Sequence, residues 1–377
     1  MSKVKLGDVA IEHKETCKGS KDGYPIVGLE HLVSEEVTLT AWDEGNDNTF
    51  TKMFRKGNVL FGRRRAYLKK AAVAPFDGIC SGDITVIEAI PDRILPELLP
   101  FIIQNDELFD FAVGKSAGSL SPRVKWEHLK NYEFELPDMD KQRELAELLW
   151  AMDATKKSYQ KLIAATDELV KSQFMEQFVI EAPYERTRLG DHISQIRGVS
   201  YKPADLRPSL SEESVLLLRA NNIGTGRINH DEVQYVAKEK VSTVQLIRAG
   251  DILMCASSGS LEHVGKAAIC LPSIEGETFG AFCKLIRPKG DLLPEYIAAY
   301  FETDEYREII MQLACGSNIN NLKAEHIDEL QIPTPPAEVQ EAFVSFLRQS
   351  DKSKFELEQA LSELTATYKR IIAENLG

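Results

Sequence analysis

The side chains best suited to chemistry in this chain of 377 residues form a basic run near its N-terminal end. Between Thr51 and Lys70 there are eight lysines and arginines and no acidic residue, although the chain as a whole has a net charge of −13. Three adjacent arginines follow a short apolar run, which places them at a strand end or on a loop. Arginine bonds bidentately to guanine, and both basic types neutralise phosphates. A nucleic-acid contact is therefore favoured over a solvated surface, with these candidates: Arg55, Arg63, Arg64, Arg65, Lys69 and Lys70.

A second, looser basic group lies further along the chain. It contains four basic residues and one acidic residue, Glu127. Local charge decides binding more than the net charge of the chain, so overall acidity does not exclude a nucleic-acid partner. The candidates from this group are Lys115, Arg123 and Lys125.

The two halves of the chain repeat the same short motifs in the same order, which indicates an internal duplication. Gly190 follows Gly7 by 183 residues, whereas Gln340 follows Gln142 by 198 residues, so loop lengths differ while the framework is kept. The matched segments include Leu6-Gly7-Asp8 with Leu189-Gly190-Asp191, Lys56–Leu60 with Ala249–Leu253, Lys70–Val73 with Lys266–Ile269, Leu95–Glu97 with Leu293–Glu295, Gly118-Ser119 with Gly316-Ser317, and Lys125–Leu129 with Lys323–Ile327.

At matching places the second half carries amides and hydroxyls instead of arginines. Ser257–Ser260 corresponds to the Arg63–Arg65 loop, and Gly316–Lys323 corresponds to Gly118–Lys125. Asparagine pairs bidentately with adenine, although Asn, Ser and Gly are also ordinary turn residues. Similar frames with different loops predict two readers with different targets, and the candidates in this half are Arg219, Asn221, Asn222, Arg227, Ser257, Ser258, Lys266, Ser317, Asn318, Asn320, Asn321 and Lys323.

Each half begins with a mixed α/β globular part. Short apolar runs bounded by Gly, Pro and Asp predict strands, and apolar residues at 3–4 spacing predict one helix in each part. The predicted strands include Val59–Phe61, Ala71–Ala74, Ile84–Ile87, Val215–Leu218, Asp251–Met254 and Ala267–Leu271, and the predicted helices are Leu95–Val113 and Leu293–Leu313.

A long amphipathic helix of about 35 residues follows each globular part. We expect the two helices to pair antiparallel, with each packing on its own globular part as the alternative. The first seam contains Leu145, Leu148, Met152, Leu162 and Leu169, with Tyr159 and Thr166 between them, and the second contains Phe343, Phe346, Leu347, Leu357, Leu361, Leu364, Tyr368 and Ile371. The expected fold is α+β with a pseudo-twofold internal repeat, divided into 1–138 and 183–335 as recognition domains and 139–182 and 336–377 as coiled-coil spacer helices.

The sequence contains no recognisable catalytic constellation. Methyl-donor and phosphate loops and an amino-methyltransferase motif are missing, and no His pair has metal spacing. The six cysteines are scattered, which is typical of a reduced cytoplasmic protein, and no stretch approaches the roughly 18 apolar residues of a membrane span. We therefore expect a protein without catalysis, metal or membrane attachment of its own.

Four features, each present twice, resemble the specificity subunit of type I restriction-modification enzymes over essentially the whole chain. They are Val4–Asp8 with Thr187–Asp191, Gly57–Arg64 with Gly250–Leu253, Gly118–Pro137 with Gly316–Pro336, and Gln142-Arg143-Glu144 with Glu338–Glu341. The first half has Leu-Pro-Asp-Met-Asp where the family usually has a Pro-Pro run, and Ser257–Ser260 lacks the double arginine of the first half.

This resemblance implies a DNA-binding specificity subunit for phage defence by DNA methylation and restriction. Two target recognition domains would read a bipartite site in double-stranded DNA, with two methyltransferase subunits and a restriction/translocase subunit as partners. No cofactor would bind this chain, because S-adenosylmethionine, Mg and ATP would belong to those partners. Candidate subunit-binding residues on the spacer helices are Leu148, Met152, Tyr159, Leu162, Leu169, Leu357, Leu361, Leu364 and Tyr368.

Three other functions stay open at this point. The chain could be the recognition subunit of a type II or phage-defence methylation system with the same architecture. It could also be an enzyme in its own right, or a structural coiled-coil adaptor that leaves the Thr51–Lys70 charge without a role.

Overall fold

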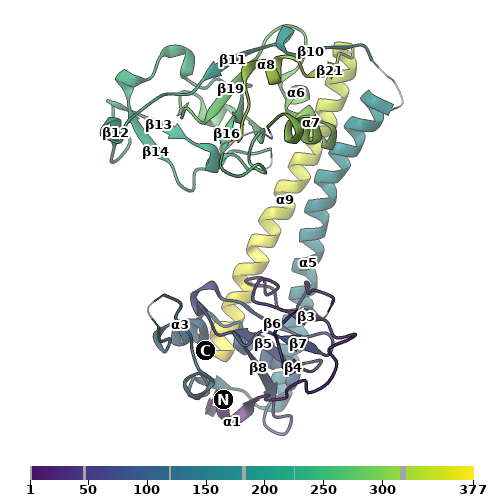
Figure 1. Cartoon of the computed structure of the whole chain (residues 1–377), viewed down its shortest axis with the longest axis vertical. Coiled ribbons are helices and arrows are strands. Elements are labelled where there is room, and N and C mark those ends of the chain that lie inside the picture. Colours follow the sequence, from purple (N-terminus) through teal and green to yellow (C-terminus); the bar gives the residue numbers. More distant parts are fainter. Residues whose placement is uncertain (1, 46–47, 119, 181–183, 225, 315–319) are drawn as a thin grey trace. The chain divides into compact units, whose positions relative to one another are not determined.

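The protein divides into two compact units. The computed structural model describes residues 2–45, 48–118, 120–180, 184–224, 226–314 and 320–377. Unit 1 is Met1–Lys161 with Leu357–Gly377, and unit 2 is Leu162–Glu356. The long helices α5 (Met139–Met175, 37 residues) and α9 (Ala337–Leu376, 40 residues) each contribute to both units (Figure 1). The predicted α+β class and the two long helices are thus confirmed, while the four-part domain division stays a prediction.

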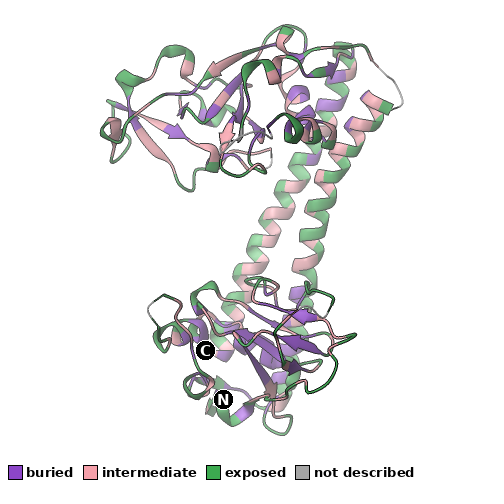
Figure 2. Ribbon diagram, in the orientation of Figure 1, coloured by how far each residue is buried: buried purple, intermediate pink, exposed green. Residues whose placement is uncertain are grey.

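The described residues of unit 1 form three small sheets, with strand orders β2-β8-β5-β6, β3-β7-β4 and β1-β9. The strands are β1 (Ser2–Lys5), β2 (Ala10–Glu12), β3 (Ile26–Val27), β4 (Lys52–Phe54), β5 (Val59–Gly62), β6 (Ala71–Val73), β7 (Gly78–Cys80), β8 (Ile84–Ala89) and β9 (Glu133–Leu136). The short helices are α1 (Leu6–Val9), α2 (Leu99–Ile103), α3 (Asp106–Gly114) and α4 (Trp126–Leu129). Strand β5 and most of β8 are buried, as Figure 2 shows, so these strands form the centre of the unit.

Unit 2 repeats this plan. Its β10-β21 and β11-β19-β15-β17 sheets correspond to β1-β9 and β2-β8-β5-β6, and the parallel pair β13-β18 corresponds to the parallel pair β3-β7. The strands are β10 (Arg186–Arg188), β11 (Ile193–Arg197), β12 (Leu206–Arg207), β13 (Ser214–Leu218), β14 (Gln234–Ala237), β15 (Ile252–Cys255), β16 (Ser257–Ser258), β17 (Ala267–Ile269), β18 (Thr278–Phe279), β19 (Cys283–Pro288), β20 (Asn320–Asn321) and β21 (Gln331–Pro333). The helices are α6 (Pro294–Tyr300), α7 (Asp304–Ala314) and α8 (Ala324–Asp328).

Short helical turns connect these elements. A π-helical turn, Glu176–Ile180, follows α5. The 3₁₀ turns are Ala66–Leu68, Pro96–Leu98, Leu189–Asp191, Pro203–Asp205, Ala220–Asn222, Lys238–Lys240, Thr243–Gln245 and Pro272–Ile274.

The predicted duplication extends to individual hydrogen bonds. The buried Gln142 side chain accepts from the Leu95 N–H at 2.8 Å and donates to the Pro137 carbonyl at 2.8 Å. In unit 2 the buried Gln340 side chain accepts from the Leu293 N–H at 2.8 Å and donates to the Pro335 carbonyl at 2.9 Å. Each glutamine therefore fastens the start of its long helix to the globular part of its own unit.

The turn before the central strand is also repeated. Gly57 and Gly250 have φ values of 87° and 85°, a left-handed conformation that glycine adopts without steric cost. The next residue is buried in both units, and its side chain accepts a backbone N–H: Asn58 from Arg55 and Asp251 from Arg248, each at 2.8 Å. These local features start β5 and β15 in the same way.

The two helices predicted within the globular parts are each broken. Leu95–Val113 consists of a 3₁₀ turn, α2 and α3, and Leu293–Leu313 consists of α6 and α7. Asn105 begins α3 because its side chain accepts from the Glu107 N–H at 3.1 Å. Thr303 has the same role before α7, accepting from the Tyr306 N–H at 3.3 Å. In each unit a polar residue within the apolar pattern caps the start of a new helix, so the predicted single helix is two helices.

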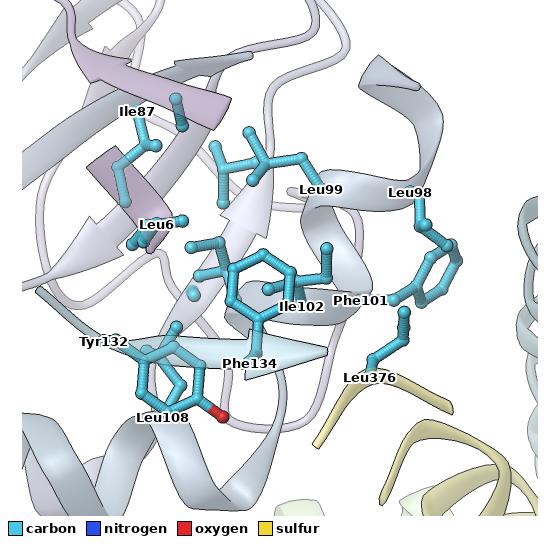
Figure 3. Packing of buried hydrophobic residues seen from close by; sticks show 14 of the residues in the cluster. Leu6, Ile87, Leu98, Leu99, Phe101, Ile102, Leu108, Tyr132, Phe134 and Leu376 are labelled. Atoms are coloured by element: carbon cyan, nitrogen blue, oxygen red, sulfur yellow. The ribbon is translucent and has the colours of Figure 1, made fainter. Parts of the chain in front are cut away.

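Each unit builds its core partly from the long helices. In unit 1, Leu376 of α9 lies in the cluster of Phe101 and Phe134, as Figure 3 shows. Leu145 and Leu149 of α5 belong to the same cluster. In unit 2 the rings of Phe174 on α5 and Phe343 on α9 have centroids 5.6 Å apart, while Asp167 pairs with Lys354 at 2.5 Å. From the Asp167–Lys354 pair to the Phe174–Phe343 pair, the residue number rises along α5 and falls along α9. The two helices therefore run antiparallel, as predicted.

The predicted seam of the first helix is partly wrong. Leu145 and Met152 are buried, but Leu148, Leu162 and Leu169 are 45 %, 51 % and 52 % exposed. The buried positions near the start of α5 follow the 3.6-residue period of a helix packed on a globular core, and Leu148 lies outside that stripe. Because Met152 is buried, its side chain is not available to bind another subunit. The ring of Tyr368 is used within unit 1, where it packs edge-on against Phe101.

Candidate nucleic-acid interface

In unit 1, two loops predicted separately to carry basic residues lie side by side. The Arg63 N–H donates to the Asp83 carbonyl at 3.0 Å, and the Arg63 carbonyl accepts from the Val124 N–H at 3.0 Å. The Arg65 N–H donates to the Pro122 carbonyl at 2.9 Å, and Arg64 bridges Arg123 through the backbone. We call residues 63–65 and 121–124 the unit 1 loop pair.

Asp83, which was not singled out from the sequence, joins the arginines of this loop pair. Its carboxylate accepts from Arg123 at 2.7 and 3.3 Å and lies 3.5 Å from Arg64, which also donates to the Ser121 hydroxyl. The hydrogen bond from Arg123 holds the pKa of Asp83 below its usual range and raises the pKa of Arg123. The side chains of Arg64 and Arg123 stay 39 % and 41 % exposed, so a ligand could still reach them.

The backbone beside this loop pair is strained. Arg65 and Lys69 have φ values of 54° and 50°, and only one other non-glycine residue in the described ranges, Glu35, has a positive φ. Such conformations are costly for side-chain-bearing residues and concentrate at functional sites. Here they bracket the 3₁₀ turn Ala66–Leu68 that follows the arginines.

The other basic candidates of unit 1 have partners within the protein. Arg55 pairs with both Glu15 and Asp77, which raises its pKa. The ammonium groups of three lysines are also engaged: Lys69 contacts Asp106 at 2.6 Å, Lys70 donates to the Leu29 carbonyl at 2.8 Å, and Lys115 lies 5.7 Å from the Phe111 ring centroid. Lys125 is exposed. Arg55 is as exposed as Arg64 and Arg123, but it is neutralised by two carboxylates, whereas those two arginines share one. They are therefore stronger candidates than Arg55 or Lys70.

Unit 2 builds the same frame from other side chains. The Ala256 and Ser257 N–H groups donate to the Phe282 carbonyl at 2.9 and 3.0 Å, and the Leu322 N–H donates to the Ala256 carbonyl at 2.9 Å. Strands β16 and β20 pair Ser257 with Asn321. Ala256, Ser257, Phe282, Asn321 and Leu322 thus stand where Arg63, Arg64, Asp83, Arg123 and Val124 stand in unit 1. We call residues 256–258 and 320–322 the unit 2 loop pair.

The remaining unit 2 candidates divide into two groups. The Lys266 N–H donates to the His263 carbonyl at 3.2 Å, and the Lys266 carbonyl accepts from the Cys255 N–H at 2.9 Å. Lys323 is exposed and contacts Glu325 at 3.1 Å. Ser317 and Asn318 lie outside the described residues.

Arg219, Asn221, Asn222 and Arg227 belong to a separate turn. Asn222 is fully buried, and its side chain accepts from the Arg219 N–H at 2.9 Å, so it shapes the turn and cannot reach DNA. The prediction of a DNA contact is wrong for Asn222. Arg219 donates to the Glu232 carbonyl at 3.0 Å, and Asn221 is exposed.

Metal-binding or reactive side chains are sparse in the described parts of the chain. One group there, Glu30, His31 and Asp43, has ligand atoms close enough to share a cation, but His31 Nδ1 already accepts the Gly28 N–H at 3.0 Å. Burial raises the pKa of the Cys80 thiol to about 12, and it raises the pKa values of Cys255, Cys270 and Cys283 as well. None of the described helices is long and apolar enough to cross a membrane.

Comparison with known proteins agrees with this two-fold plan. The family described as "Type I restriction modification DNA specificity domain" matches residues 1–165 and 219–365, which include both loop pairs. The chain belongs to this family. The resemblance inferred from the repeated motifs is thereby confirmed.

Three curated relatives are specificity subunits of type I restriction enzymes. The StySPI subunit of Salmonella potsdam is 38 % identical over 168 residues, and the EcoKI subunit of Escherichia coli K12 is 37 % identical over the same length. Each match covers 44 % of this chain and 36 % of the relative, so it spans about a third of either relative's length. The MjaVIII subunit of Methanocaldococcus jannaschii is 20 % identical over 366 residues, or 90 % of this chain and 79 % of the relative.

Solved structures share the fold of the whole chain. A chain from a study of assembly and conformational transition of the type I restriction-modification system has a TM-score of 0.58 at 19 % identity, covering 99 % of this chain and 97 % of its own. The type I specificity subunit of M. genitalium has a TM-score of 0.56 at 12 % identity, covering 100 % and 96 %. At these identities the likeness concerns the fold alone.

Proposed function

We propose that this chain is the non-catalytic specificity subunit of a type I restriction-modification complex and that its units read the two halves of a bipartite DNA target. The observation that carries this proposal is the shared backbone frame with unlike loop pairs. Two backbone hydrogen bonds and one backbone bridge recur in both units, while Ser257 and Asn321 replace Arg64 and Arg123. Two readers of different sequences require such a shared frame with different side chains.

The chemistry of each loop pair suits a different mode of reading. Partly exposed arginine side chains such as those of Arg64 and Arg123 can bond to guanine or to phosphate. Hydroxyl and amide groups such as those of Ser257 and Asn321 hydrogen-bond to base edges without adding charge. We therefore assign most of the electrostatic contact to unit 1 and a larger share of neutral contacts to unit 2.

Two methyltransferase subunits and a restriction/translocase subunit complete the proposed complex. S-adenosylmethionine, Mg²⁺ and ATP would bind to these partners, which supply the chemistry. Exposed leucines on α5 support a docking role for this helix: Leu148 in unit 1, and Leu162 and Leu169, one heptad apart, in unit 2. Exposed apolar side chains on a helix are a common feature of protein–protein interfaces.

Methylation mapping tests the proposal directly. The chain is expressed with the methyltransferase subunit of its own system in a host without DNA methylation, and modified bases are mapped by long-read sequencing. We expect a motif of two fixed half-sites separated by unspecified bases. The double variant Arg64→Ala/Arg123→Ala should lose or relax one half-site only.

Lys3→Ala/Arg93→Ala is the matched control, because it removes two exposed positive charges from the same unit outside the loop pair. Methylation that is the same with and without the chain would overturn the proposal, as would methyl transfer by the purified chain alone. A system that has the methyltransferase but no restriction/translocase subunit would favour the recognition subunit of a type II or phage-defence system.

A further inference from the structure

One apolar side chain stands in solvent beside the unit 2 loop pair. Phe282 ends the turn between β18 and β19 and is 67 % exposed. Its carbonyl accepts from both Ala256 and Ser257, so its backbone is directly joined to one loop of the pair. A single exposed apolar residue is ordinary on a protein surface, and the position of Phe282 is what gives it meaning.

The same position in unit 1 is occupied by Asp83. Both residues precede the long strand of the main sheet, β19 or β8, and both offer their carbonyl to the first residue of the loop pair. In unit 1 the side chain at this position reaches Arg64 and Arg123 of both loops. Phe282 therefore occupies the position whose side chain, in unit 1, contacts both loops of the loop pair.

We propose that Phe282 contacts bases of the second half-site, an inference that rests on the proposed function of the loop pairs. Serine and asparagine supply hydrogen bonds there, and an aromatic ring supplies the apolar contact that they lack. Two base features accept such a contact: the C5 methyl group of thymine and the face of a base exposed at an opened step. Neither involves charge, so Phe282 should affect sequence choice and affinity without affecting salt dependence.

The experiment uses the full chain in complex with its methyltransferase subunit and a duplex carrying the mapped motif. Phe282→Ala should weaken binding about 10- to 100-fold, as expected for loss of one desolvated apolar contact. The slope of log affinity against log salt should stay unchanged, and the methylated motif should relax in the second half-site only. Phe282→Tyr keeps the ring and should retain most of the affinity.

Leu271→Ala is the matched control. Leu271 is 58 % exposed in the same unit but lies beyond the opposite end of β15, since Ile269 pairs with Ile252. Two modified duplexes identify which base feature Phe282 contacts. Deoxyuridine in place of thymine in the second half-site removes the methyl group, and 2-aminopurine fluorescence reports an opened base step. The feature that Phe282 contacts is the one whose effect on binding or fluorescence is lost in Phe282→Ala.

The outcomes separate this inference from the proposed function. If Phe282→Ala binds and methylates as the natural chain does, while Asn321→Ala is impaired, the inference fails and the proposed function stands. Equal losses for Phe282→Ala and Leu271→Ala would also overturn it. If the natural complex shows no dependence on the chain for DNA choice, both fail together.

Discussion

The two loop pairs share a backbone and differ in almost every side chain. In unit 1, Arg64 and Arg123 are joined by Asp83, a cluster of two positive charges and one negative charge. In unit 2 the equivalent positions hold Ser257, Asn321 and Phe282, which carry no charge. Backbone hydrogen bonds thus fix where the loops lie in both units, and under the proposed function the side chains decide which DNA groups the loops contact.

The arginines of unit 1 should produce the largest difference between the two loop pairs. Arg64→Ala/Arg123→Ala should lower DNA affinity of the methyltransferase complex about 100-fold near physiological salt, because it removes two cations and leaves Asp83 facing phosphates. Each lost phosphate contact also lowers the salt slope by about one. Affinity measured by fluorescence anisotropy over a salt series checks both values.

Ser257→Ala/Asn321→Ala is the counterpart of this variant in unit 2. It should weaken binding without changing the salt slope. If the two double variants reduced the slope equally, the assignment of charge contacts to unit 1 would be wrong.

The glutamines that fasten the long helices test whether the frame is equally important in both units. Gln142→Ala and Gln340→Ala each remove a buried amide that bonds to backbone groups at both ends. Leaving those groups unpaired should lower the free energy of unfolding by about 2 kcal/mol in each case. Urea denaturation of the full chain measures the loss, with the exposed Gln160→Ala on α5 as control. A large loss for one glutamine and none for the other would show that the two glutamines do not contribute equally to the free energy of unfolding.

Asn321 tests the neutral contacts of unit 2 by themselves. Asn321→Ala should reduce affinity about tenfold, the usual effect of losing a bidentate base contact, and should change only the second half of the methylated motif. Long-read methylation mapping reads out the motif. A change in the first half-site would mean that the units do not read separate halves.

Much of this organisation was predictable from the sequence because the duplication is visible as repeated motifs. The motifs Lys70–Val73 and Lys266–Ile269 fall on the equivalent strands β6 and β17, and the two glutamines were already aligned. The arginine loop and the Lys115–Lys130 group were each identified, but their contact was not, since the Arg64–Arg123 bridge joins segments 59 residues apart.

Other features depended on tertiary packing that a linear pattern does not contain. Asp83 and Phe282 lie in short turns that carry no sequence motif. They are recognised as equivalent because the carbonyl of each accepts a hydrogen bond from the first residue of its loop pair. Alignment of the repeat at the start of β8 and β19 would have paired them. The placement of Leu148 in the seam between α5 and α9 is wrong because a heptad pattern assumes a single partner, whereas the start of α5 packs on a globular core. Asn222 was misassigned because a polar residue in a turn can serve the turn itself.

The smallest expected difference between the units concerns Gln104 and Glu302, the residues immediately before the helix caps Asn105 and Thr303. Gln104 donates to the Glu36 and Ala71 carbonyls, at 3.0 and 2.5 Å. Glu302 is a carboxyl in the equivalent place, and burial raises its pKa, an effect that Lys171 and a hydrogen bond from the Gly226 backbone oppose in part. Unit 2 thus keeps a half-buried acid where unit 1 has an amide.

Glu302→Gln should therefore stabilise unit 2 at neutral pH by about 0.5–1 kcal/mol, because the amide still accepts a hydrogen bond but has no charge to desolvate. A carboxyl whose pKa is raised in the folded state favours folding when protonated, and this contribution is lost as pH rises through the raised pKa. The advantage of Glu302→Gln should be absent below the ordinary pKa of 4.5 and should grow above it. Urea denaturation of both proteins across this pH range measures the difference, and an advantage independent of pH would show that charge at Glu302 is not its cause.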